Sequence, residues 1–125
     1  MTIRNGIACV LACVLAPSAA PAHHSDVVIF DTNQEITWTG TLSSVDWRNP
    51  HIALTIETED NGDRLAIWSF AGPPPSRFRA ASVSKSDFEG SLGKTITIKG
   101  SPARDGSLSG VIHVITLADG RAWSF

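Results

Sequence analysis

Alternating apolar and polar positions in the middle of the chain predict a β-hairpin. Residues 51–59 place their large apolar side chains on one side, the pattern of a half-buried strand: these are Ile52, Leu54 and Ile56. The segment that follows, residues 64–70, is apolar on both sides: Leu65 and Ile67 on one, and Ala66, Trp68 and Phe70 on the other. The sequence Asp60-Asn61-Gly62-Asp63 between the two segments favours a tight turn, because Asn and Gly tolerate positive φ.

Residues 35–47 predict a long first strand with a change of phase. The apolar residues occupy even positions up to Leu42 and odd positions at Val45 and Trp47. Because a slip of one residue moves every following side chain to the other face, this change predicts a β-bulge or bend. Gly40 could relieve a tight bend. A long, bent first strand is typical of small barrels.

Two more strands are predicted later in the chain, at residues 95–99 and 110–117. The two isoleucines of the first point inward. The second is apolar on both faces apart from His113 and Thr116, which indicates burial on both sides or a crossing between layers.

Residues 71–94 separate the third strand from the fourth. Pro73-Pro74-Pro75 cannot join a regular ladder, and Ser76 could cap a short helix from Arg77 to about Ser82. Five strands with a helix between the third and the fourth predict a mainly β fold, a small five-stranded OB-like barrel. A plain five-stranded open barrel without the helix is the alternative.

The first 22 residues predict a signal peptide for export. Arg4 makes the start positive, residues 7–15 form an apolar run, and Ala20-Pro21-Ala22 is a typical small-residue cleavage site. Because the run is too short to span a bilayer, we expect a periplasmic protein with no membrane span. Its single β-barrel domain would cover residues 23–125. Lipid attachment at Cys13 is the alternative.

Composition narrows the function of that domain. It keeps all twelve acidic residues but loses one of the ten basic ones, so no nucleic-acid ligand is expected, since such ligands need a basic surface. Both cysteines, Cys9 and Cys13, lie in the signal, which excludes disulfides and cysteine chemistry from the domain. No nucleophile elbow or phosphate loop is present, so we expect a protein that is not an enzyme. A core of this size suffices for a monomer.

Six elements of the chain, taken in their order and spacing, resemble a family of small exported bacterial proteins of unknown function. They are Ala22-His23-His24-Ser25, Gly40-Thr41, Trp47-Arg48-Asn49-Pro50-His51, Trp68, Pro102-Ala103-Arg104-Asp105-Gly106-Ser107 and Thr116-Leu117-Ala118-Asp119-Gly120-Arg121. The resemblance covers nearly the whole domain and implies a periplasmic OB-like β-barrel, without an established activity. In that family a glutamate and then Gly-Ser-Pro tend to follow the tryptophan of the third strand. Here Ala71 and Gly72-Pro73-Pro74 stand in those places, so a carboxylate with a chemical role in relatives would be missing.

The histidine pair at the predicted mature start is the most specific chemical signal. Cleavage after Ala22 would give His23 a free α-amine beside its imidazole, and an amine with two or three imidazoles suits Cu(II), Ni(II) or Zn(II). This arrangement resembles the histidine brace of periplasmic copper proteins. We therefore predict a metal site formed by His23, His24 and His51, with copper as the favoured metal. A solvated His-His end without metal is the alternative.

Two histidines also have structural interpretations. His51 follows the Asn49-Pro50 turn, and a hydrogen bond from it to the backbone of that turn is the favoured role over ligand binding. His113 lies among apolar residues, where most histidines are packed neighbours of the core. Of the four tryptophans, three are expected in the core, although aromatic residues on the second and third strands could stack a ligand.

The sequence therefore predicts a protein that acts by binding. The first hypothesis is a periplasmic metal-handling protein, with copper as the metal. The second is a module for a non-metal small ligand or an unidentified protein partner, bound on the face of the second and third strands and the Pro-rich loop.

Overall fold

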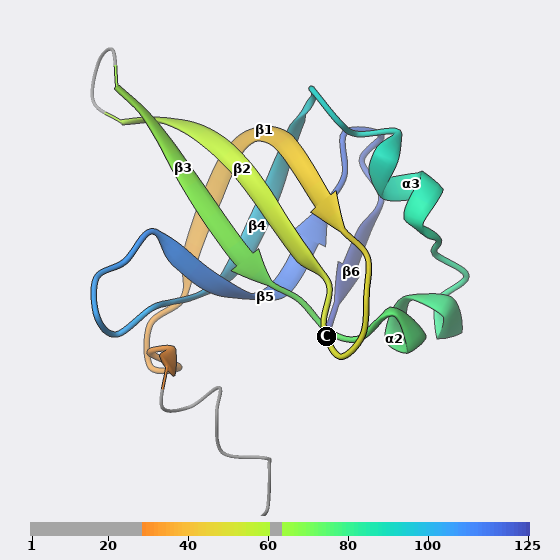
Figure 1. Cartoon of the computed structure of the whole chain (residues 1–125), viewed down its shortest axis with the longest axis horizontal. Helices are drawn as coiled ribbons and strands as arrows, with labels where there is room; N and C mark the ends of the chain where they lie inside the picture. The colour runs from red at the N-terminus through yellow and green to blue at the C-terminus, as the bar shows by residue number, and fades with distance from the viewer. Residues whose placement is uncertain (1–28, 61–63) are drawn as a thin grey trace, which may run out of the picture.

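Five strands close into a small barrel in the computed structural model, which describes residues 29–60 and 64–125. The barrel strands are β1 (Ile36–Asp46), β2 (Ala53–Asp60), β3 (Arg64–Ala71), β4 (Thr95–Pro102) and β5 (Ser109–Thr116). A sixth strand, β6 (Ala122–Ser124), pairs with β5. Two short helices, α2 (Pro75–Ala80) and α3 (Lys85–Glu89), follow β3 and lie on one side of the strands (Figure 1).

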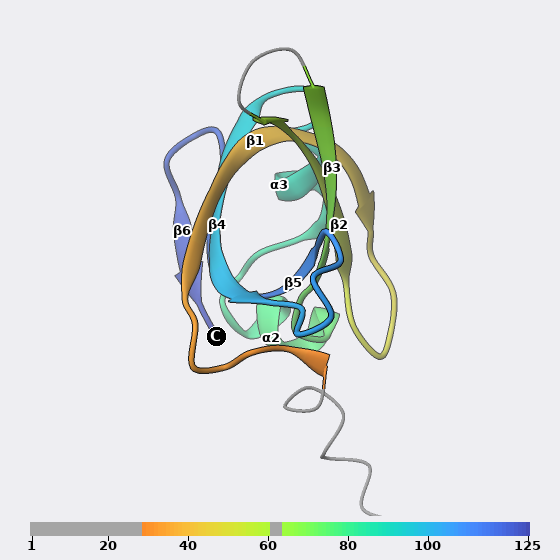
Figure 2. The same ribbon diagram turned by 90° about the vertical axis from the view of Figure 1, so that its left-hand side faces the viewer.

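The strand order is that of an OB barrel. β1 pairs with β2 through one part of its length and with β4 through the other, and β4 pairs with β5. The ring closes where β5 runs parallel to the end of β3, while the other barrel pairs are antiparallel. Figure 2 shows the strands curving around this ring. The prediction of a mainly β, five-stranded OB-like barrel is confirmed.

The predicted hairpin and its inward face are present. β2 and β3 pair along their full length, from Ala53 opposite Ala71 to Asp60 opposite Arg64. The predicted turn residues 61–63 lie outside the described residues. As the alternation indicates, the inward side chains of this region and of β4 are buried in one core: Ile52, Leu54, Ile56, Ile96 and Ile98.

The phase change in the first strand corresponds to a β-bulge. The register of β1 against β2 shifts between Leu42 and Ser44, as predicted. The bulge lets the strand keep Leu42 inside the barrel while its end curves away along β2. A second irregularity shifts the register of β4 against β5 between Lys99 and Gly100.

The segment between β3 and β4 holds more structure than predicted. The expected helix is present but runs from Pro75 to Ala80, because proline fits the first turn of a helix, where its missing N–H is not needed. Ser76 therefore lies inside the helix, and its predicted capping role is wrong. A second helix, α3, was not predicted, although Ser84 and Asp87 form a capping box at its start. β6 was also missed, since a strand of three residues is too short to show a period.

Aromatic residues join the two helices to the barrel. Phe78 from α2 and Phe88 from α3 are fully buried and meet edge to face, with ring centroids 5.2 Å apart. Trp47, just beyond β1, packs against both at 5.1 and 5.2 Å. Of the other tryptophans, Trp38 is buried in the core, and Trp68 and Trp123 are partly buried against it. The predicted core position of three tryptophans is confirmed for Trp38 alone, because the other three are only partly buried and pack against the core from outside.

We predict that Gly100→Ala destabilises the fold strongly. A β-carbon at this bulge would overlap the carbonyl oxygen of Val111 on β5, so the backbone of one strand must shift. The free energy of unfolding, measured by urea titration, should fall by about 1–3 kcal/mol. In the matched control Gly90→Ala, the nearest atoms are 3.5 Å from the new carbon, and stability should stay unchanged or rise slightly. Equal stability of the two variants would contradict the tight approach of β4 and β5.

Candidate functional site

The outer face of β2 and β3 carries two exposed apolar side chains beside two acids. In β3, Leu65 is 68% exposed and Ile67 is 60% exposed, whereas Trp68, the residue after Ile67, packs against the core. The antiparallel register places Leu65 opposite Glu59 and Ile67 opposite Glu57. A single exposed apolar side chain is ordinary, but two at alternate positions of one strand leave an apolar face in contact with water.

The same part of β3 is an open strand edge. β3 pairs along its whole length with β2, but with β5 only from Ser69 to Ala71. Within the part of the chain that the structure describes, no strand pairs with the other side of β3 between Arg64 and Trp68. This stretch lies away from the helices in Figure 1. Unpaired strand edges can receive a further strand.

The loop between β4 and β5, residues 103–108, borders the open edge. The N–H of Ser69 donates to the carbonyl oxygen of Leu108 at 3.0 Å, and the side chain of Leu108 is 49% exposed. On its other side, the loop is held by a β-bridge between Ala103 and Phe30, which precedes β1. The loop is therefore fixed beside β3 and not merely near it.

We call Leu65, Ile67 and Leu108 the edge patch. The sequence indicates that residues 64–70 are apolar on both sides, but that pattern does not indicate which side remains exposed. No motif in residues 103–108 distinguishes Leu108. The patch depends on where β5 pairs with β3 when the barrel closes. The alternation of apolar and polar residues along a strand does not predict that position.

His51 lies in the loop between β1 and β2, and its side chain is exposed. Its Nδ1 is 3.1 Å from the carbonyl oxygen of Gly72. Because a carbonyl oxygen only accepts hydrogen bonds, Nδ1 must carry the proton and donate, which leaves the lone pair of Nε2 free in the neutral ring. The prediction that His51 bonds the backbone of the Asn49-Pro50 turn is wrong in its partner, since the bond ties this loop to the residue after β3. The Asn49–Pro50 peptide itself is cis.

The other two predicted metal ligands, His23 and His24, lie outside the described residues, so the predicted site of three histidines remains a prediction. Residues 29–60 and 64–125 contain no group of three or more His, Cys, Asp or Glu side chains that could hold a metal ion. His113 is partly buried on β5, in agreement with its predicted place beside the core.

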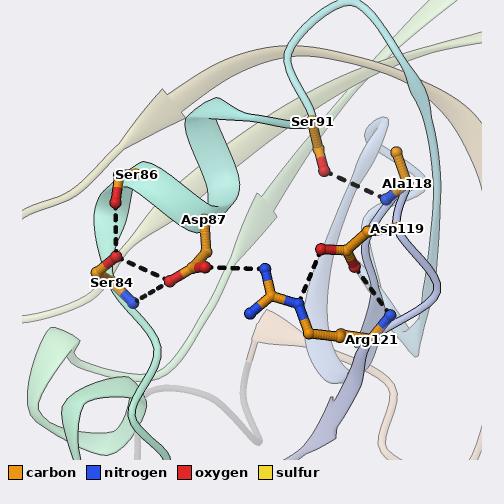
Figure 3. A network of polar contacts seen from close by, with 7 residues as sticks. All are labelled: Ser84, Ser86, Asp87, Ser91, Ala118, Asp119 and Arg121. Atoms are coloured by element: carbon orange, nitrogen blue, oxygen red, sulfur yellow. Dashed lines mark hydrogen bonds and ion pairs between the residues drawn. The ribbon is translucent and has the colours of Figure 1, made fainter.

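A polar hollow of about 340 Å³ lies between α3 and the turn from β5 to β6. Arg121 crosses it and donates through Nη2 to Asp87 and through Nε to Asp119, both at 2.8 Å. Asp87 also accepts from the backbone N–H and the hydroxyl of Ser84, again at 2.8 Å. Figure 3 shows these side chains pointing toward one another. Because the ionic groups bind each other, we interpret Ser84, Asp87, Asp119 and Arg121 as a polar clasp that fastens α3 to the turn.

The clasp changes the acidity of its members. The backbone N–H of Ser84, then Arg121 and the Ser84 hydroxyl, lower the pKa of Asp87 to about 2. Hydrogen bonds from the backbone and side chain of Arg121 also lower the pKa of Asp119. A carboxyl group whose pKa is lower in the folded state stabilises the fold above its unfolded pKa, and this contribution is lost as the pH falls through the folded value.

We therefore predict that Asp87→Asn lowers the Tm by a few degrees at pH 7 and that this difference shrinks between pH 4 and about 2. Below that range the wild-type carboxyl is protonated and resembles the amide. Thermal unfolding followed by circular dichroism at several pH values measures both quantities. The control Glu89→Gln removes an acid from the same helix. Glu89 forms an exposed i,i+4 ion pair with Lys85 at 3.2 Å, and such pairs contribute little to stability, so this variant should change the Tm little at pH 7. A pH-independent effect of Asp87→Asn would refute an ionic clasp.

Comparison with known proteins gives a family and one structural neighbour. The mitochondrial single-stranded DNA-binding protein Rim1 of S. cerevisiae aligns with a TM-score of 0.46 and 14% sequence identity, over 70% of this chain and 96% of that one. No curated protein matches the chain in sequence. Among the described residues, no helix is long and apolar enough to cross a membrane. Residues 10–113 match the model of a family of unknown function, in line with the uncharacterised family expected from the sequence. Since the match covers most of the chain, the protein belongs to the DUF6152 family of unknown function.

Proposed function

We propose that the protein is a binding module and not an enzyme, and that its ligand is another polypeptide held on the outer face of β2 and β3. The observation that carries the proposal is the edge patch beside the unpaired stretch of β3. Exposed apolar side chains contribute little to folding, whereas a polypeptide that covers them removes apolar area from water. The face of the second and third strands is also the usual ligand face of OB barrels.

The charge of this face supports a polypeptide over a nucleic acid. Glu57 and Glu59 lie on the same side of the sheet as Leu65 and Ile67. Their carboxylates would repel a phosphate backbone, which needs basic side chains to replace its counterions. A polypeptide can offer apolar and basic side chains together.

The remaining chemistry of the described chain supports binding over catalysis. The charged groups of the polar clasp are bonded to one another, so no carboxylate there is free to act as a base. We propose that the protein works in the periplasm after residues 1–22 are removed, on the basis of the signal pattern at the start of the sequence. We also propose that it works as a monomer, because a domain of this size can bury a sufficient core alone.

Removing the edge patch should abolish binding without harming the fold. We predict that the triple variant Leu65→Ser, Ile67→Thr, Leu108→Ser keeps its free energy of unfolding within about 0.5 kcal/mol. Peptides selected on the wild-type protein from a random displayed library should bind this variant at least about tenfold more weakly, because they lose their apolar contacts. Fluorescence anisotropy of the labelled peptides measures the affinities.

The matched control is Leu92→Ser, which removes another exposed apolar side chain, 41% exposed, in the turn after α3. Binding of the selected peptides should be unchanged in this variant. If the triple variant binds them as tightly as the wild type does, the ligand face lies elsewhere and the proposal fails.

A second candidate function is binding of a transition metal, copper in the first place, by His23, His24 and His51. The observation that favours it is the hydrogen bond from His51 Nδ1 to Gly72. Ligating histidines commonly donate their other ring nitrogen to a backbone carbonyl, which fixes the tautomer and aims the free nitrogen at the metal. The two terminal histidines enter this proposal through the sequence alone.

For the protein that begins at His23, we predict that His51→Ala weakens Cu(II) binding by at least about tenfold, as measured by titration against a competing chelator. The control His113→Ala removes a histidine that the proposal does not use and should leave the affinity unchanged. Replacing His23 and His24 together by Ala should abolish tight binding. Wild-type affinity in both the His51 variant and this double variant would exclude the site.

A further inference from the structure

The backbone of the open edge of β3 points its hydrogen-bonding groups away from the barrel. The N–H of Ser69 donates toward the β4–β5 loop and not toward β2. Because backbone N–H and C=O groups alternate in direction along a strand, those of Leu65 and Ile67 point to the same side as those of Ser69. No described residue accepts or donates to them across that edge. These groups are therefore available to an added strand.

The side chains on the two faces of this edge differ in chemistry. On the outer face, each apolar side chain of β3 stands beside an acid of β2: Leu65 beside Glu59, and Ile67 beside Glu57. No ion pair between either acid and another described residue is present. A strand added next to β3 would be separated from these acids by one strand, a distance that long basic side chains can cross with their stems on apolar surface.

On the inner face, the same stretch of β3 presents Ala66 and Trp68. Both are only partly buried, although Trp68 packs against Trp38 with ring centroids 5.2 Å apart. β5 does not pair with this part of β3, so an added strand would point every second side chain to the inner face, where the nearest of them would contact Trp68. Apolar side chains suit that position.

From these observations we propose that β3 binds an extended segment of another protein by strand addition, and that this segment alternates basic residues with apolar residues. The basic residues lie over Leu65 and Ile67 and pair with Glu59 and Glu57, while the apolar residues cover Trp68. Main-chain hydrogen bonds supply affinity, and the alternating side chains supply specificity. The inference rests on the proposed function and specifies its ligand. A second copy of β3 fits less well, because it offers Leu65 and Ile67 but no basic residue opposite the two acids.

The test uses blocked octapeptides added to the full mature protein. The first alternates lysine and valine, the second alternates glutamate and valine, and the third has four valines followed by four lysines. We expect the first to bind at least tenfold more tightly than either of the others in fluorescence anisotropy. At saturation, amide hydrogen exchange at Leu65 and Ile67 should slow at least tenfold, which a purely side-chain contact would not produce.

Charge-matched variants isolate the two acids. The double variant Glu57→Gln, Glu59→Gln should weaken the alternating lysine peptide severalfold and reduce the salt dependence of its binding. The double variant Glu35→Gln, Glu89→Gln removes the same charge from two exposed sites elsewhere and should leave binding unchanged. Equal effects of the two variants would show a response to net charge alone and overturn the pairing with Glu57 and Glu59.

The other outcomes separate this inference from the proposed function. If the lysine peptide binds no better than its controls while library peptides still require the edge patch, strand addition by a basic segment is wrong and the proposed function stands. If neither class of peptide requires the patch, both fail. A dimer in sedimentation that Ile67→Lys dissociates would identify the occupant as a second copy and overturn the inference.

Discussion

The short parallel contact between β3 and β5 is the constraint on which the rest of the molecule depends. Three residues of β3, Ser69 to Ala71, close the ring. Had the contact extended further toward the start of β3, Leu65 and Ile67 would belong to a paired inner strand. Because it stops at Ser69, the barrel has a closed end near the helices and an open strand edge near the hairpin.

The polar groups at the helix end of the barrel have partners within the chain, whereas several at the hairpin end have none among the described residues. At the helix end, the polar clasp and the aromatic residues around Phe78 satisfy charges and fill space within the chain itself. At the hairpin end, backbone groups, two carboxylates and an apolar face are left without partners among the described residues. The helix end is thus stabilised within the chain, whereas the hairpin end is the surface that we propose for binding another polypeptide. His51 combines both situations, because its Nδ1 is hydrogen-bonded within the chain while the lone pair of its Nε2 is free in the neutral ring.

Sequence patterns predicted the parts of the fold that depend on local alternation. The buried face of β2, the bulge after Leu42 and the hairpin to β3 all follow from which neighbouring residues are apolar. The missed helix α3 has a local signal, the capping box from Ser84 to Asp87. However, the usual residue at the position of Asp87 in this motif is Glu or Gln, and a helix of five residues is too short to show a helical period of apolar residues.

The candidate surface could not be predicted in the same way. Which edge of β3 stays open depends on where Ser109 meets Ser69, forty positions away in the chain. Likewise, the partner of His51 is the carbonyl of Gly72, which only the closed barrel brings near. The sequence-based metal site remains a prediction, because two of its three histidines lie outside the described residues.

The distance along the chain between the two sides of the β3–β5 contact also bears on how the protein folds. The β1–β2–β3 meander and the β4–β5 pair join segments that are close in sequence, so they can form with little loss of chain entropy. Joining Ser69 to Ser109 encloses all of the intervening chain, including both helices. The barrel therefore closes through two long-range pairings, this one and that of β1 with β4, and both cost more chain entropy than the local hairpins do. After closure, no described strand pairs with this side of β3 from Arg64 to Trp68, so that part of its edge stays open in the folded protein.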